Sequence, residues 1–146
     1  MKQESKPYFR LFDHTADLGM EIFGVNERAL FANAGKALFE VMVTSEEPPS
    51  ESGHQHRIEI EGEDWPDLMI NWLRELLYFW HGAQQIINRI EIESLTPTRL
   101  QALVTSEDFS PQIHQINKEI KAVTYHQIDV GSQADGSWRA RVVFDV

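Results

Sequence analysis

Residues 64–82 read DWPDLMINWLRELLYFWHG and carry the clearest helical pattern of the chain. Large apolar side chains recur three or four positions apart and would give a helix one wide apolar face. They are Met69, Trp72, Leu73, Leu76, Leu77 and Trp80. Asp64 is a typical N-cap, Pro66 suits the first turn, and Asp67 falls near the third helical position. Gly82 is expected to end the helix, because glycine adopts a left-handed cap conformation without strain.

On both sides of this helix the sequence alternates between apolar and polar residues, as half-buried strands do. After the helix, residues 86–94 and 100–105 predict two strands that are joined through a turn at 96–98. Before the helix, residues 57–61 predict another strand. Residues 44–55 predict a loop, because their proline, serine, glycine and glutamate content cannot bury a core.

A second helix is expected nearer the start of the chain. Asn26 suits an N-cap, and Glu27 would place a negative charge in the first turn. The apolar residues that follow recur at helical spacing and predict an amphipathic helix of roughly four turns. They are Leu30, Ala34, Ala37, Leu38 and Val41.

Further strands are expected toward the two ends of the chain, at residues 8–12, 18–23, 120–130 and 138–146. The last two would form a hairpin, because Asp135 followed by Gly136 is a strong turn signal. Residues 107–117 are expected to be irregular. This order of elements predicts an α+β fold, a single domain over residues 1–146 whose mostly antiparallel or mixed β-sheet carries two principal helices.

Charge and composition narrow the classes of function. The chain has 13 basic and 23 acidic residues and a formal net charge of −10. This balance argues against direct strong nucleic-acid binding, since phosphate contacts need clustered lysine and arginine, and it favours divalent cations or a basic protein surface. The absence of cysteine excludes disulfides and thiolate nucleophiles. No signal peptide and no membrane span are expected, which favours the cytoplasm.

The polar run Asp13-His14-Thr15-Ala16-Asp17 is the first candidate for chemistry. If the run is extended, alternation places both aspartates on one side and His14 on the other. Asp17, with Asp13 beside it, would then ligate a cation. The alternative is that both aspartates are turn or capping residues with solvated carboxylates.

The second candidate is the ending Asp145-Val146, which follows a strand-like pattern. Alternation predicts that Trp138 to Val146 bury one face of this strand and turn Asp145 to the other. One interpretation is an edge strand that ends in solvent. The other directs the Asp145 carboxylate and an oxygen of Val146 at a metal. If folding brings the two ends together, Asp17 would complete the oxygen-rich set that a divalent cation needs.

The third candidate is the segment 120–126. As a strand it would place Lys121 and Tyr125 on one face and His126 on the other, among apolar residues. His126 is then either a half-buried, hydrogen-bonded residue or a group that serves acid–base chemistry near neutral pH.

Three motifs, in this order, resemble the signatures of the archease family. The first is residues 13–19, the second residues 121–126, and the third the ending at residues 143–146. The leucine-rich helix at 68–78 also resembles the family. The resemblance extends over nearly the whole chain and is more specific than any one motif.

The resemblance implies a small cytosolic protein that is not itself an enzyme. It would assist the tRNA-splicing RNA ligase by promoting ligase guanylylation and multiple turnover. It would also bind a divalent cation, with calcium expected first and magnesium or manganese as alternatives. The implied ligands are Asp17, Asp145 and Val146. The implied supporting residues are Asp13, His14, Lys121 and His126.

Two other functions stay open at this stage. The same carboxylates, with His14 or His126 as a base, would suit a small metal-dependent hydrolase. A chaperone-like protein whose cation is purely structural is the other alternative.

Overall fold

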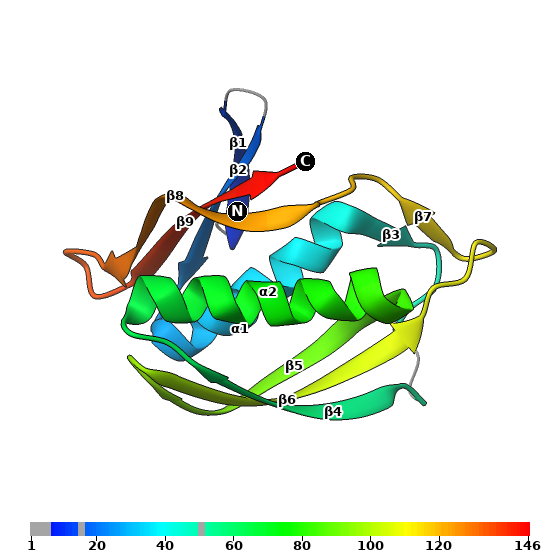
Figure 1. Ribbon diagram of the computed structural model, residues 1–146, viewed down its shortest axis with the longest axis horizontal. Coiled ribbons are helices and arrows are strands. Elements are labelled where there is room, and N and C mark those ends of the chain that lie inside the picture. The colour runs from blue at the N-terminus through cyan, green and yellow to red at the C-terminus, as the bar shows by residue number, and fades with distance from the viewer. Residues whose placement is uncertain (1–6, 15–16, 50–51) are drawn as a thin grey trace, which may run out of the picture.

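Two helices lie between a four-stranded and a three-stranded β-sheet (Figure 1). The computed structural model describes residues 7–14, 17–49 and 52–146. The helices are α1 (Glu27–Met42) and α2 (Trp65–Ala83). The α+β fold with two principal helices is therefore confirmed. The helices are covered by sheet on both sides, because each has contacts with strands of both sheets.

The strands of the two larger sheets come from opposite parts of the chain. The first sheet contains β1 (Phe9–His14), β2 (Asp17–Gly24), β9 (Trp138–Asp145) and β8 (Ala122–Ser132), in that order. The second contains β4 (His54–Glu61), β6 (Arg99–Asp108) and β5 (Gln85–Thr96), in that order. A short separate pair contains β3 (Val43–Ser45) and β7 (His114–Ile116). All pairings among the described residues are antiparallel.

One hydrophobic core joins these layers. It includes Leu38 and Trp72 from the two helices, Val104 from the three-stranded sheet and Val142 from the four-stranded sheet. The indole N–H of Trp72 donates to the carbonyl of Phe31 at 2.9 Å, a buried contact that fixes α2 against α1. Burial of this hydrogen-bonded indole removes a large apolar area from water without leaving its polar group unpaired.

The start of each helix agrees with its sequence signal. The Asn26 side chain accepts a hydrogen bond from the backbone N–H of Ala29 at 2.8 Å. The Asp64 side chain accepts one from the backbone N–H of Asp67 at 2.9 Å. Both contacts satisfy N–H groups that have no partner inside the helix, so both predicted N-caps are confirmed.

The end of α2 differs from its prediction. Gly82 lies inside the helix, which runs to Ala83. Gln84 supplies the left-handed cap, with φ of 49°, and its N–H donates to the carbonyl of Trp80 at 2.9 Å. Glycine lowers the cost of a left-handed cap but does not require one, and here a glutamine takes that conformation.

The two segments predicted to be irregular are so only in part. β4 already begins at His54, and β6 continues to Asp108. β7 lies within the segment 107–117 and pairs through three residues with β3, whose last two residues lie within the segment 44–55. A three-residue strand contains too little alternation to be recognised, and its pairing depends on a partner far away in the sequence.

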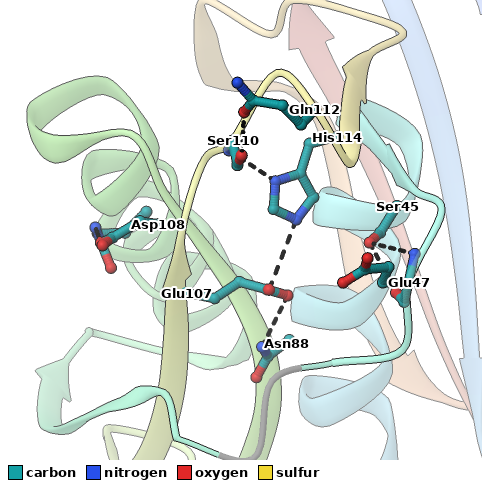
Figure 2. A network of polar contacts seen from close by, with 9 residues as sticks. Ser45, Glu47, Asn88, Glu107, Asp108, Ser110, Gln112 and His114 are labelled. Atoms are coloured by element: carbon teal, nitrogen blue, oxygen red, sulfur yellow. Dashed lines mark hydrogen bonds and ion pairs between the residues drawn. The ribbon is translucent and has the colours of Figure 1, made fainter.

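A buried polar network fixes β7 to the three-stranded sheet (Figure 2). His114 is only 5% exposed, and its Nδ1 accepts from the backbone N–H of Ser110 at 2.9 Å. Its Nε2 lies 3.6 Å from Oε2 of Glu107, whose other oxygen accepts from the Asn88 amide at 3.0 Å. A ring nitrogen that accepts leaves the proton of neutral histidine on Nε2, so a donor faces a carboxylate.

Candidate metal centre

Folding brings Asp17 and Asp145 together at one end of the four-stranded sheet. Asp17 on β2 is the register partner of Asp145 on β9. Directly opposite residues of antiparallel strands share a face and have Cβ atoms about 5 Å apart. The end of β9 accordingly lies beside the β1–β2 hairpin (Figure 1). We call these two residues the aspartate pair.

The outer strands continue the same row across the sheet. His14 on β1 pairs with Asp17, and Ala122 on β8 pairs with Asp145. Asp17 is half-buried and Asp145 is exposed. Val146 follows directly and packs in part against the hydrophobic core. The main-chain oxygens of Val146 are therefore held one residue from the aspartate pair.

The aspartate pair places two acceptors side by side. Ionised carboxylates only accept hydrogen bonds, and like charges directly opposite in a sheet destabilise it. A cation held about 2.3–2.6 Å from both carboxylates would turn this repulsion into attraction. A donor set made only of oxygens fits calcium, magnesium or manganese better than zinc.

The side chains alone do not complete a metal site. Among the described residues, no three or more histidine, cysteine, aspartate or glutamate side chains form a group that could hold a metal. The remaining ligands would have to be main-chain oxygens of Val146, water, or groups of a partner. Incomplete coordination by the chain is typical of cations that share their ligands with a substrate or a second molecule.

Asp13 is not on the same side as Asp17, and the extended reading of the first motif is wrong. β1 ends at His14 and β2 begins at Asp17, so the motif forms the two sides of a hairpin. Asp13 pairs with Leu18, one position away from the His14–Asp17 row. Successive positions alternate between faces, which puts the exposed Asp13 on the opposite face of the sheet. The side chain of His14 lies outside the described part of the structure.

The second motif reaches the aspartate pair through its backbone. The N–H of Lys121 donates to the carbonyl of Asp145 at 2.8 Å, and the Lys121 side chain is exposed. β8 begins only at Ala122, so Lys121 precedes the strand. Lys121 is therefore close enough in the chain to contribute a positive charge at the same end of the sheet.

His126 is exposed, and the half-buried position predicted for it is wrong. The β8–β9 register shifts between Thr124 and Asp129, and Gln127 has φ of 53°. The backbone N–H of His126 donates to Oγ1 of Thr124 at 3.3 Å. This irregular stretch interrupts the alternation on which the prediction depended.

Contacts between α2 and the second motif were missed at the sequence level. The hydroxyl of Tyr125 donates to Oδ1 of Asp67 at 2.8 Å, and the Arg74 guanidinium lies 4.8 Å from the centre of the Tyr125 ring. Donation from the Glu63 backbone N–H, followed by that from Tyr125, holds the pKa of Asp67 below its ordinary 3.8. The same bond raises the pKa of Tyr125 above its ordinary 10.0. The seven-residue spacing of Asp67 and Arg74 on one helix was the available signal.

Comparison with known proteins extends these observations over the whole chain. A family model described as the Archease protein family matches residues 9–146. Protein archease of Methanosarcina mazei is 31% identical over an alignment of 150 residues that covers 100% of both chains. Protein archease of Pyrococcus abyssi is 32% identical over 139 residues, covering 92% of this chain and 96% of that protein.

Two solved structures share the arrangement of helices and strands. The solution structure of Methanobacterium thermoautotrophicum protein 1598 has a TM-score of 0.71 and 29% identity, covering 95% of this chain and 99% of that chain. The crystal structure of a Thermotoga maritima protein, described as an archease and possible chaperone, has a TM-score of 0.63 at 20% identity and covers 100% of both chains. That second similarity concerns the fold. Because the family model spans almost the entire sequence, the chain belongs to the archease family.

Proposed function

We propose that this protein binds a divalent cation and activates the tRNA-splicing RNA ligase, promoting its guanylylation and multiple turnover. In this proposal the protein is not an enzyme itself. Family membership supports the proposal, and the register that places Asp17 opposite Asp145 is the observation that carries it. The two aspartates lie far apart in the sequence, yet both stand at the same end of one sheet.

The proposed cation is calcium, with magnesium or manganese as alternatives. Asp17, Asp145 and the main-chain oxygens of Val146 would hold it from the side of this chain. Calcium accepts six to eight oxygen ligands in flexible geometry, whereas magnesium demands a near-ideal octahedron. A pair of strand carboxylates with room for water or partner groups suits the more permissive ion.

The proposed partner is a protein, and the overall charge supports this choice. A net charge of −10 favours approach to a basic surface and speeds the encounter at low salt. The description of the Thermotoga maritima relative as a possible chaperone also agrees with a protein partner. Neither described helix combines the length and apolarity needed to cross a bilayer. We place the protein in the cytoplasm with its proposed partner.

The test is a ligase assay with and without this protein. Guanylylated ligase and ligated RNA per ligase are measured with the wild type, with Asp17→Asn and with Asp145→Asn. The matched control is Asp129→Asn, which removes an exposed charge from the same sheet, where it pairs with Arg139. We expect both aspartate-pair variants to lose at least about tenfold of the stimulation, because each loses a charged ligand. The control should retain it.

The alternative functions give different results in the same experiment. Full stimulation by both variants, together with a melting temperature that falls on chelation, would favour a structural cation in a chaperone-like protein. Metal-dependent hydrolysis of a phosphoester by this chain alone would favour the hydrolase. Absence of any stimulation by the wild type would contradict the proposed function directly.

A further inference from the structure

Three polar residues lie along one side of α2 and contact the segment that precedes and opens β8. They are Asp67, Arg74 and His81, spaced seven positions apart, and we call them the polar face of α2. Seven residues make almost two helical turns, so such residues project in nearly the same direction. At 1.5 Å per residue, the face is about 21 Å long.

Each residue of this face binds one point on the segment 120–125. The Nε2–H of His81 donates to the carbonyl of Ile120 at 2.9 Å. The Arg74 guanidinium donates to the carbonyl of Val123 at 3.2 and 3.4 Å.

Asp67 makes the third contact, by accepting from the Tyr125 hydroxyl at 2.8 Å. An extended stretch of five steps is about 17 Å long, which matches the polar face within side-chain reach.

The segment 120–125 needs this support because its own pairing is short. β8 is an edge strand, and its ladder with β9 runs from Ala122 to Thr124 before the register shifts. Ile120 and Val123 are buried at 0% and 2% exposure, so the segment is anchored in the core. Apolar burial is non-directional, however, whereas hydrogen bonds to the carbonyls of Ile120 and Val123 set the position along the strand.

The segment held in this way borders the aspartate pair. Ala122 is the register partner of Asp145, and the Lys121 N–H donates to the Asp145 carbonyl. The end of β9 therefore has Asp17 on one side and this segment on the other. A displacement of the segment would separate Asp145 from Lys121 and Ala122.

We propose that Asp67, Arg74 and His81 are positioning residues that hold Lys121 and the end of β9 in register, so that Asp145 stays opposite Asp17. This inference deepens the proposed function, on which its cation-binding part rests. The positioning acts through backbone carbonyls and the Tyr125 hydroxyl, and none of the three side chains touches the cation.

The decisive variant is Arg74→Gln, which removes the two contacts to the Val123 carbonyl and the stacking on Tyr125. Two quantities are measured: calcium affinity by calorimetry, and the hydrogen-exchange rate of the Lys121 amide in the calcium-free protein. We expect about tenfold weaker affinity and about tenfold faster exchange, because the Lys121–Asp145 hydrogen bond opens more often. Arg74→Lys keeps one charged donor and should recover part of both effects.

The matched control is Arg57→Gln, which removes an exposed arginine from a surface pair with Glu93 on the other sheet. It should change neither quantity. Unchanged affinity and unchanged Lys121 exchange in folded Arg74→Gln would overturn the proposal, even if the melting temperature fell. If the wild type bound no calcium, magnesium or manganese, the proposed function would fail, whereas faster Lys121 exchange would still support the positioning role.

Discussion

Two polar clusters of this protein are built on opposite principles. In the network around His114, unlike groups face each other: Nδ1 accepts a hydrogen bond from the Ser110 N–H, and Nε2 lies 3.6 Å from a Glu107 carboxylate oxygen, beyond hydrogen-bond distance. In the aspartate pair, two acceptors stand opposite each other in the sheet. Unlike groups that face each other attract, whereas two carboxylates that face each other repel, and a cation between them would replace this repulsion by attraction.

The two clusters also differ in how deeply they are buried. His114 and Glu107 are almost entirely enclosed, with side chains 1% and 12% exposed. Asp145 is exposed, and Asp17 is half-buried. A polar group with complementary partners can be buried at modest cost, whereas a ligand-binding group has to remain accessible. Complementarity and burial together thus distinguish a structural cluster from a candidate functional one.

The largest expected effect comes from removing the aspartate pair. The double variant Asp17→Asn with Asp145→Asn should bind calcium about 100-fold more weakly, because two charged ligands are lost. Without cation it should melt about 1–3 °C higher than the wild type, since the like charges are gone. Calorimetric titration and thermal unfolding measure the two effects. Equal affinity in variant and wild type would rule the pair out as ligands.

The opposite result is expected for the structural network. His114→Ala should lower the free energy of unfolding by about 2–3 kcal/mol, because it removes a buried side chain and leaves the backbone N–H of Ser110 without its acceptor. Its calcium affinity should not change. Denaturant titration measures the loss, and His54→Ala, at an exposed position, is the control and should cost little. A fall in calcium affinity in His114→Ala would erase the distinction between the two clusters.

A smaller effect is expected from Val146. One glycine added after Val146 extends the chain by about 3.4 Å and should weaken calcium binding about fivefold, because it displaces a main-chain oxygen that we propose as a ligand. The same glycine inserted after Gly136, in the exposed β8–β9 turn, should leave the affinity unchanged. Both variants are compared by calorimetry. If the extended chain binds calcium as tightly as the wild type, Val146 is not a ligand.

The smallest effect concerns pH. The folded-state pKa of Asp67 is lowered, chiefly by the Glu63 N–H and then by Tyr125. Its ionised form therefore stabilises the fold above the ordinary value of 3.8, and this contribution is lost as pH falls through the lower folded-state value. Asp67→Asn should show a shallower loss of melting temperature below pH 4. If the melting temperatures of Asp67→Asn and the wild type fall equally below pH 4, the contacts of Asp67 do not stabilise the fold.

Structural features that depend on neighbouring residues could be predicted from the sequence, and those that depend on long-range pairing could not. Asn26 and Asp64 were recognisable as caps because the N–H groups they satisfy lie three residues away. The pairing of β3 with β7 has no local signature. The antiparallel pairing of β1 with β2 has no local signature either, and it places Asp13 on the face opposite to the one predicted.

The candidate site also has a part that the sequence predicts and a part that only the tertiary structure shows. The residue types at both ends of the sequence suggested oxygen ligands, but alternation alone did not decide between a metal site and solvated carboxylates. The register of β2 against β9 is a tertiary property, and it is what places Asp17 opposite Asp145. The contacts of α2 with Tyr125 were missed because they depend on how α2 packs beside β8, which the spacing of polar residues on one helix does not specify.

The most direct measurement is a crystal structure of the protein grown with calcium. The account predicts an ion about 2.3–2.6 Å from carboxylate oxygens of both Asp17 and Asp145. A Lys121 ammonium between the two carboxylates, with no ion beside it, would contradict the account.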